Sequence, residues 1–165
     1  MSSLVIRAAG PDDGPAIAAV QRAAWQATYG AWIPEVVAGL DPVRTADNWA
    51  RASRRPDQRV AVAVGDGRVV GYAWSGPPDG SGDADSGELL ALYVHPAAQR
   101  RGAGRLLVAD ALAWLASTGR ERCLVWAVER FEPARRFYER EGFTSDPGLT
   151  RPWRGLAEIR YSRPL

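Results

Sequence analysis

A glycine-containing turn between an apolar run and a helical pattern is the part of this sequence that points most directly to chemistry. Gly102 and Gly104 have no Cβ, so the backbone N–H groups around them can approach a ligand closely. A helix that begins at Gly104 has several unpaired N–H donors at its first turn, together with about half a positive charge. Arg100, Arg101 and Arg105 add positive charge beside that turn. The segment therefore predicts a site for a phosphorylated, anionic ligand.

Two widespread phosphate-binding patterns do not match this turn. The dinucleotide-binding pattern G-x-G-x-x-G needs a third glycine, and residue 107 is Leu. The P-loop needs a lysine, whereas all 21 basic residues of this chain are arginine. What remains is the run Gln-Arg-Arg-Gly-Ala-Gly over residues 99–104. We expect backbone N–H groups of residues 100–105 to be the main donors to the anion, with the arginine side chains secondary.

The elements that must position this turn form a strand–helix–strand unit. Residues 88–94 read as a buried strand, residues 104–117 as a helix and residues 122–128 as a nearly continuous apolar strand. Such a crossover places its two strands side by side and parallel. The other expected elements, in chain order, are a strand over 4–8, a helix that starts near Asp12, a helical segment over 25–40 broken at Pro34, a helix over 43–54, a hairpin of 59–64 and 68–74, a helix over 133–140, and strands over 143–146 and 157–162.

Composition limits the class of protein. With 46% hydrophobic and 24% charged residues, we expect one domain spanning residues 1–165 with a substantial core. The net charge of +2 and the spread of arginines over the whole chain argue against nucleic acid as a partner. A single cysteine excludes an internal disulfide, and no apolar run is long enough to cross a membrane. We therefore expect a cytoplasmic protein with no membrane partner and no metal site.

Several segments resemble motifs of one family, the GCN5-related N-acetyltransferases (GNAT). The run over 99–104 is similar to the family's Q/R-x-x-G-x-G/A loop, and Leu92-Tyr-Val-His-Pro96 is similar to the strand end that precedes it. Residues 131–143 follow the downstream pattern N-x-x-A-x-x-F-Y-x-x-x-G-F at every marked position except the first, where Phe131 replaces Asn. Residues 24–30 look like the substrate-side helix of many small members. The resemblance covers most of the chain.

The resemblance implies a fold and a cofactor. We expect an α/β (α+β) protein with a mixed, mostly antiparallel central sheet of about seven strands flanked by helices, and acetyl-CoA as co-substrate. In the family, the strand before the loop and the next strand splay apart, and the pantetheine arm pairs with the exposed strand edge. A backbone N–H near Val94 would then polarise the thioester carbonyl. The expected cofactor-binding residues are Leu92, Tyr93, Val94, Gln99, Arg100, Arg101, Gly102, Ala103, Gly104, Arg105, Phe131, Ala134 and Phe137.

Two side chains are expected to move protons. The resemblance places Tyr138 where a phenol can protonate the departing thiolate of coenzyme A. It also places Glu88 where a carboxylate takes a proton from the substrate amine, directly or through water, because only a neutral amine can attack. The alternatives are that Tyr138 is only a core aromatic residue and that Glu88 is only an exposed charge at a strand end. Asp85 and Glu129 are weaker candidates for the base.

The sequence indicates less about the residues that bind the acetyl acceptor. Trp25, Tyr29 and Trp74 are the expected substrate-binding residues, although large aromatic side chains more often belong to a core. The predicted activity is transfer of an acetyl group from acetyl-CoA to a primary amine of a small molecule or peptide, by direct attack in a ternary complex. The alternative is a non-catalytic module that binds or senses acyl-CoA. Family members often dimerise, so a homodimer is also an expectation.

Overall fold

The computed structural model describes residues 3–80 and 84–165, which form a single seven-stranded sheet flanked by helices. The strand order is β1-β2-β3-β4-β5-β7-β6. Only β4 and β5 pair in parallel among the described strands, so the expected mixed, mostly antiparallel sheet is confirmed. The strands are β1 (Val5–Ala8), β2 (Arg59–Gly65), β3 (Arg68–Gly76), β4 (Ser86–Val94), β5 (Arg122–Val128), β6 (Thr144–Trp153) and β7 (Leu156–Pro164).

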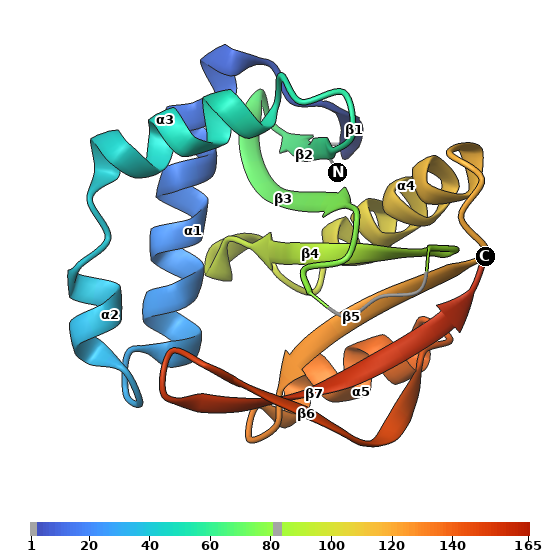
Figure 1. The fold of residues 1–165 in the computed structure, drawn as a ribbon. Coiled ribbons are helices and arrows are strands. Elements are labelled where there is room, and N and C mark those ends of the chain that lie inside the picture. The colour runs from blue at the N-terminus through green and yellow to red at the C-terminus, as the bar shows by residue number, and fades with distance from the viewer. Residues whose placement is uncertain (1–2, 81–83) are drawn as a thin grey trace.

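Five α-helices of the described chain cover the two faces of this sheet (Figure 1). Proline stands in the first turn of four of them, where its missing N–H costs nothing and its fixed φ favours the helix. Gly14 lets α1 and α3 cross closely, because a Cβ there would overlap the carbonyl oxygen of Ala46. The helices are α1 (Gly14–Tyr29), α2 (Pro34–Ala38), α3 (Pro42–Ala52), α4 (Ala103–Ser117) and α5 (Glu132–Arg140), with short 3-10 turns η1 (Pro11–Asp13) and η2 (Pro96–Ala98).

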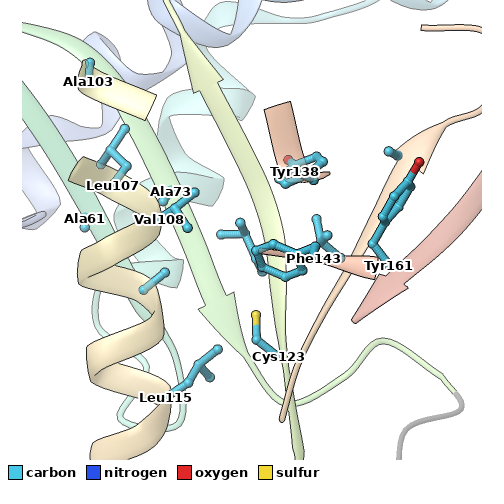
Figure 2. Packing of buried hydrophobic residues seen from close by; sticks show 14 of the residues in the cluster. Ala61, Ala73, Ala103, Leu107, Val108, Leu115, Cys123, Tyr138, Phe143 and Tyr161 are labelled. Carbon is cyan, nitrogen blue, oxygen red and sulfur yellow. The ribbon is translucent and has the colours of Figure 1, made fainter. Parts of the chain in front are cut away.

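Alternation along the strands divides the interior into two layers. Val60 and Val62 of β2 pack with residues of α1 and α3, whereas their neighbours Ala61 and Ala63 pack with residues of α4. Because successive strand residues point to opposite faces, α1 and α3 must cover one face of the sheet and α4 the other. Figure 2 shows the second layer, in which α4 and the buried Cys123 of β5 lie near residues from α5 and β7. Cys123 is thus the small core residue that its apolar surroundings predict.

The parallel pair at the centre of the sheet is only half closed. β4 and β5 pair from Ser86 opposite Arg122 to Leu89 opposite Val125, and no further. Residues 90–94 of β4 and 126–128 of β5 therefore have no partner across this gap, and Figure 1 shows the two strands diverging towards α1. Leu90 is an extra residue at this point, because Trp74 of β3 pairs with Ala91 but Ser75 pairs with Leu89. The splay that the resemblance implied is present in this chain.

The C-terminal hairpin departs most from the sequence-based expectation. A strand over 143–146 was expected, but β6 continues to Trp153 after a register shift between Ser145 and Thr150. Pro147 and Pro152 argued against a strand here, because proline cannot donate a hydrogen bond to a neighbouring strand. Proline is tolerated at a sheet edge, and β6 is an edge strand. β7 is also longer than the expected 157–162. The hairpin thereby reaches α1 and α2, because Trp153 packs against Trp25 and Leu156 packs against the cluster that contains Val37.

Smaller differences concern helix limits. The helical segment expected over 25–40 is two elements, since α1 ends at Tyr29 and α2 begins at Pro34. The helix expected over 43–54 is α3, which starts one residue earlier and ends two residues earlier. The helix expected from Gly104 starts at Ala103, with Gly102 as its N-cap. No helix of the described residues is both long and apolar enough to cross a membrane.

Candidate active site

A cleft of about 860 Å³ passes through the gap between β4 and β5. One end lies at the start of α4 and beside α5, on the sheet face that these helices cover. The other end lies against α1, α3 and the β6–β7 hairpin, on the opposite face. We call these the cofactor end and the acceptor end, for the ligands that the sequence predicts there. A molecule that occupies the whole cleft therefore touches both faces of the sheet.

The cofactor end is built from backbone groups at the start of α4. The first bond back into the helix is donated by Leu106 to the carbonyl of Gly102, so the N–H groups of residues 102–105 have no partner within the helix. Gly102 has φ 89°, and a Cβ added to it would meet nothing within 4 Å. Arg100 also has a left-handed backbone, at φ 64°. Free donors, open space and the helix dipole make this turn suitable for a phosphate group.

The free edge of β4 continues the cofactor end. His95 donates its N–H to Val70 of β3 at 2.8 Å, so its polar backbone groups point towards β3. Because strand residues alternate in this direction, Leu92 and Val94 direct theirs into the gap. The side chain of Gln99 donates to the carbonyl oxygen of Val94 at 3.2 Å, which agrees with this orientation. The edge can pair with an extended ligand as an added strand would.

Glu88 is a buried carboxylate beside the point where β4 and β5 separate. It is 1% exposed, so the alternative of an exposed strand-end charge is wrong. Its Oε2 accepts a hydrogen bond from the backbone N–H of Asp79 at 2.7 Å. Burial raises the pKa of Glu88 to about 7, although this hydrogen bond and the nearby positive charge of Arg151 both lower it. A carboxylate with such a pKa can accept and release a proton near neutral pH.

A second buried carboxylate, Glu158 of β7, lines the same cleft and was not anticipated from the sequence. Its Oε2 accepts a hydrogen bond from Arg151 Nε at 2.7 Å. Burial nevertheless raises the pKa of Glu158. The Arg151 guanidinium also lies 4.4 Å from the centre of the Trp126 ring and 3.9 Å from the Asp79 carboxylate. Arg151 therefore offsets negative charge at this part of the cleft.

Tyr138 approaches the gap from the α5 side. It is 7% exposed, and its ring packs 5.4 Å from Phe137 and 5.7 Å from Phe143, the latter near it in Figure 2. Burial raises the pKa of its phenol well above the usual range, so the hydroxyl stays protonated. Tyr138 is part of the core and also lines the cleft. Glu88 and Tyr138 thus reach the cleft from different elements, β4 and α5.

Aromatic rings form the wall of the acceptor end. Trp25 of α1 lies 5.8 Å from Tyr29 and 5.4 Å from Trp153 of the hairpin, centre to centre. The hydroxyls of Tyr29 and Tyr93 are 3.1 Å apart and hydrogen bonded. Trp74 lies further along the cleft, where its Nε1 donates to Gln58 at 3.0 Å. The three aromatic residues expected to bind substrate therefore line the cleft in two separate places.

The structure brings nearly all of the expected site residues to this one cleft. Each residue expected to be catalytic, cofactor-binding or substrate-binding lines it, with the exception of Arg101. Phe131, which stands where the family motif has Asn, is the N-cap of α5 and packs 6.2 Å from Trp32. Tyr93 was expected to act only through its backbone, but its ring is partly buried and packs among aromatic residues on the acceptor side.

Sequence reasoning missed the residues that the hairpin contributes, namely Arg151, Trp153, Arg154 and Glu158. The available signal was the period-two pattern of β7. Ile159 and Tyr161 are apolar and belong to the core under α4 and α5, so Glu158 and Arg160 must face the other side. That pattern marks Glu158 as a residue on the acceptor face, but it does not show that the face is enclosed there.

Comparison with known proteins identifies what this chain is similar to. The model of the acetyltransferase (GNAT) family matches residues 19–143. An uncharacterized N-acetyltransferase of Bacillus subtilis, YuaI, is 33% identical over 138 residues, which cover 82% of this chain and 78% of that protein.

Solved structures share the fold. The PaiA N-acetyltransferase of Thermoplasma acidophilum, crystallised in complex with coenzyme A, superposes with a TM-score of 0.79 at 20% identity, covering 96% of this chain and 98% of that one. A ribosomal-protein-alanine N-acetyltransferase of Brucella melitensis gives a TM-score of 0.79 at 25% identity, covering 98% and 99% of the two chains.

Proposed function

Because this chain belongs to the acetyltransferase (GNAT) family, we propose that its cleft transfers the acetyl group of acetyl-CoA to a primary amine by direct attack in a ternary complex. The observation that carries this proposal is the partly unpaired β4–β5 boundary, lined by a buried carboxylate and a buried phenol. A cleft that is open on both faces of the sheet can receive two substrates at once. Neither substrate then has to leave before the other binds.

The cofactor end fits coenzyme A in four respects. The unpaired N–H groups at the start of α4 suit a diphosphate. The N–H groups of Leu92 and Val94 and the C=O group of Leu92 suit the amides of the pantetheine arm, which can pair with a strand edge. Space at Gly102, where a Cβ would meet nothing within 4 Å, leaves room for a ligand against the backbone. Arg100 and Arg105 line the cleft and add charge-assisted bonds to phosphate.

Glu88 is proposed as the acceptor of the amine proton. The amine nitrogen attacks the carbonyl carbon of the thioester, a C–N bond forms, and the nitrogen gives up a proton to the Glu88 carboxylate or to a water between them. A pKa of about 7 lets Glu88 be ionised in a large fraction of molecules at neutral pH. The N–H groups of Leu92 and Val94, which face the gap, are the proposed donors to the developing negative charge on the carbonyl oxygen.

Tyr138 is proposed as the group that protonates sulfur. When the C–S bond breaks, the thiolate needs a proton or a hydrogen bond, and the raised pKa of Tyr138 keeps its hydroxyl available as a donor. The products are the acetylated amine and the free thiol of coenzyme A, and solvent exchange restores both side chains. A module that only binds or senses acyl-CoA would need neither group, so the presence of both Glu88 and Tyr138 in the cleft favours the enzyme.

A single assay separates these two functions. Acetyl-CoA is incubated with the protein and a panel of primary amines, the released thiol is measured, and the acetylated amine is identified by mass spectrometry. We expect saturable acetyl-CoA binding by calorimetry and amine-dependent thiol release. Saturable binding with no release above the amine-free control, over the whole panel, would instead support the non-catalytic module.

Two wider expectations stay predictions. We propose a homodimer, because members of the family often dimerise. We also propose a cytoplasmic location, because the single cysteine, Cys123, is free and buried, which is compatible with a reducing compartment. Light scattering on the purified protein tests the first, and fractionation of cells that produce it tests the second.

A further inference from the structure

We infer that the amine acceptor also carries a carboxylate, which Arg154 and Trp25 receive at the acceptor end while Glu88 receives the amine. This inference rests on the proposed function, because it concerns the acceptor of that reaction. It follows from the distribution of donors and acceptors in the cleft, which differs between the two parts of the acceptor wall.

The hairpin part of the wall carries positive charge without a counterion. The Arg154 guanidinium lies 5.3 Å from the centre of the Trp25 ring and 5.7 Å from that of Trp153, and it lines the cleft. Within the described residues, Arg154 forms no ion pair with a carboxylate. Stacking on the two indole rings limits where the guanidinium can go, yet leaves its N–H donors free for an anion.

The Trp25 indole supplies a second, independent sign of a missing acceptor. Trp25 is 5% exposed, and its Nε1 is buried with no hydrogen-bond partner among the described residues. An indole N–H can only donate, and a buried donor without an acceptor is costly. Trp25 lines the cleft, so we infer that a ligand oxygen bound at the acceptor end accepts from this N–H. A guanidinium and an N–H donor at one place favour a carboxylate.

The backbone at Arg154 indicates that this side chain is there for a reason other than folding. Arg154 and Gly155 form the two-residue turn between β6 and β7, with φ 48° and 85°. Such a turn favours Asn or Asp at its first position. The hairpin of β2 and β3 has the same turn with Asp66 and Gly67, at φ 51° and 71°. The cleft-side hairpin thus uses a less favoured residue where the other hairpin follows the rule.

The opposite charge lies deeper in the cleft. Glu88 and Glu158 both line it, and Arg151 pairs with Glu158, so Glu88 is the carboxylate left to attract a cationic amine. Arg154 is three residues from Arg151 along the chain and at the hairpin end, whereas Glu158 is three residues beyond the turn. A ligand that bridges these two regions has a positive and a negative group at its ends, with an apolar body against the aromatic wall. This describes an amino acid in which the amine and the carboxylate are separated by an apolar chain, or a peptide-like derivative with the same separation.

The test compares acceptors that differ only in the carboxylate. Phenylalanine is paired with phenethylamine and phenylalaninamide, and 6-aminohexanoate with hexylamine, so that both a short and a long spacing are sampled. We expect at least one carboxylate-bearing acceptor to have a kcat/KM about tenfold or more above its matched amine, since a charge-assisted bond has this magnitude. Equal rates for carboxylate and matched amine in both sets would overturn the inference.

Two variants assign the effect to Arg154. Arg154→Asn suits the turn, so the protein should melt no lower than wild type, yet it should lose the preference for carboxylate through a raised KM. Arg130→Ala is the matched control, because Arg130 also stacks on an indole, 4.4 Å from the centre of the Trp32 ring, but does not line the cleft. A carboxylate preference that survives unchanged in Arg154→Asn contradicts the assignment.

Binding measurements separate failure of this inference from failure of the proposed function. Calorimetry with the coenzyme A-loaded protein reports acceptor binding without turnover. Carboxylate-dependent binding with no acetyl transfer would support the inference about the ligand and contradict the enzyme. Acetyl transfer to amines with no carboxylate preference would do the reverse.

Discussion

The cofactor end and the acceptor end of the cleft are built from different kinds of groups. At the cofactor end, the donors are backbone N–H groups of β4 and of the first turn of α4, which are within about a dozen residues of each other in the chain. At the acceptor end, the groups that line the cleft are side chains of α1, β4 and the β6–β7 hairpin. Trp25 packs against Trp153 there, although the two residues are far apart in the sequence. One end depends on local backbone conformation, and the other depends on how distant elements pack.

This difference predicts how each end responds to substitution. A backbone donor survives most side-chain changes near it, so the cofactor end is sensitive mainly to residues that set φ and ψ. A side-chain group at the acceptor end or in the gap is removed outright by one substitution. Changes of side-chain chemistry should therefore affect turnover most, and changes of backbone conformation should affect cofactor affinity.

The largest expected effect follows from Glu88→Gln. The amide has nearly the shape of the carboxylate but cannot accept the amine proton, so kcat/KM should fall by about 10²–10³-fold. Affinity for acetyl-CoA, measured by calorimetry, should change little because Glu88 is not among the backbone donors. Asp85→Asn is the matched control: it is an exposed carboxylate one residue from the start of β4 and should leave kcat/KM unchanged. A similar rate for wild type and Glu88→Gln would show that the proton leaves by another route.

The pH dependence of the wild type should report the same group. Burial raises the pKa of Glu88 to about 7, and the base acts only when ionised, so kcat/KM should rise with pH and level off above about 7. Below that value a single ionisation lowers the rate about tenfold per pH unit. A steady-state profile from acid to neutral pH measures this limb. If the limb persists unchanged in Glu88→Gln, it belongs to the amine or to another residue.

Tyr138→Phe should have an intermediate effect. Loss of the hydroxyl removes the proposed donor to the thiolate, while the ring still fills the core beside Phe143, so kcat should fall about tenfold or more with an unchanged Kd for acetyl-CoA. Tyr161→Phe is the control, since its ring lies 6.5 Å from that of Tyr138 and its hydroxyl bonds to Arg135 and Glu139 outside the cleft. Equal kcat in wild type and Tyr138→Phe would leave Tyr138 with a packing role only.

The smallest effect is expected at the cofactor end. Gly102→Ala places a Cβ on a residue with φ 89°, which costs about 1 kcal/mol and disturbs the turn that presents the N–H donors. The Kd for coenzyme A should rise about fivefold by calorimetry. Gly119→Ala, at the other end of α4 with φ 83°, carries the same backbone penalty far from the cleft. If both variants bind coenzyme A equally well, the turn does not hold the phosphate.

The two ends also differ in how far the sequence predicted them. The turn at residues 99–105 was predicted from Gly102, Gly104 and the strand before them, because backbone conformation there depends on adjacent residues. The acceptor end was predicted only in part. Trp25 and Tyr29 were named, but Glu158 and Arg154 were not, since β6 was hidden by two prolines and its hairpin was expected to be short.

For Glu88, the sequence predicted the residue's candidate role but not its acidity. Its place in a strand was predicted, although β4 begins two residues earlier than expected, at Ser86, and its candidate role was also predicted. Its pKa of about 7 was not, because that value depends on burial beneath elements that are far away in the chain, and on Asp79 and Arg151 beside it. The residue type is a property of the sequence, whereas its acidity is a property of its surroundings.

The sequence by itself determined the family, the alternation of strands and helices, and the turn at residues 99–105, since each depends on residues that are neighbours in the chain. Tertiary structure decided that β4 and β5 pair only as far as Leu89 and Val125, and that the hairpin brings Arg154 and Glu158 to the cleft. Pairing of strands that are more than thirty residues apart, and burial of charge between them, are set by the packing of the whole sheet. No local pattern in this chain encodes them.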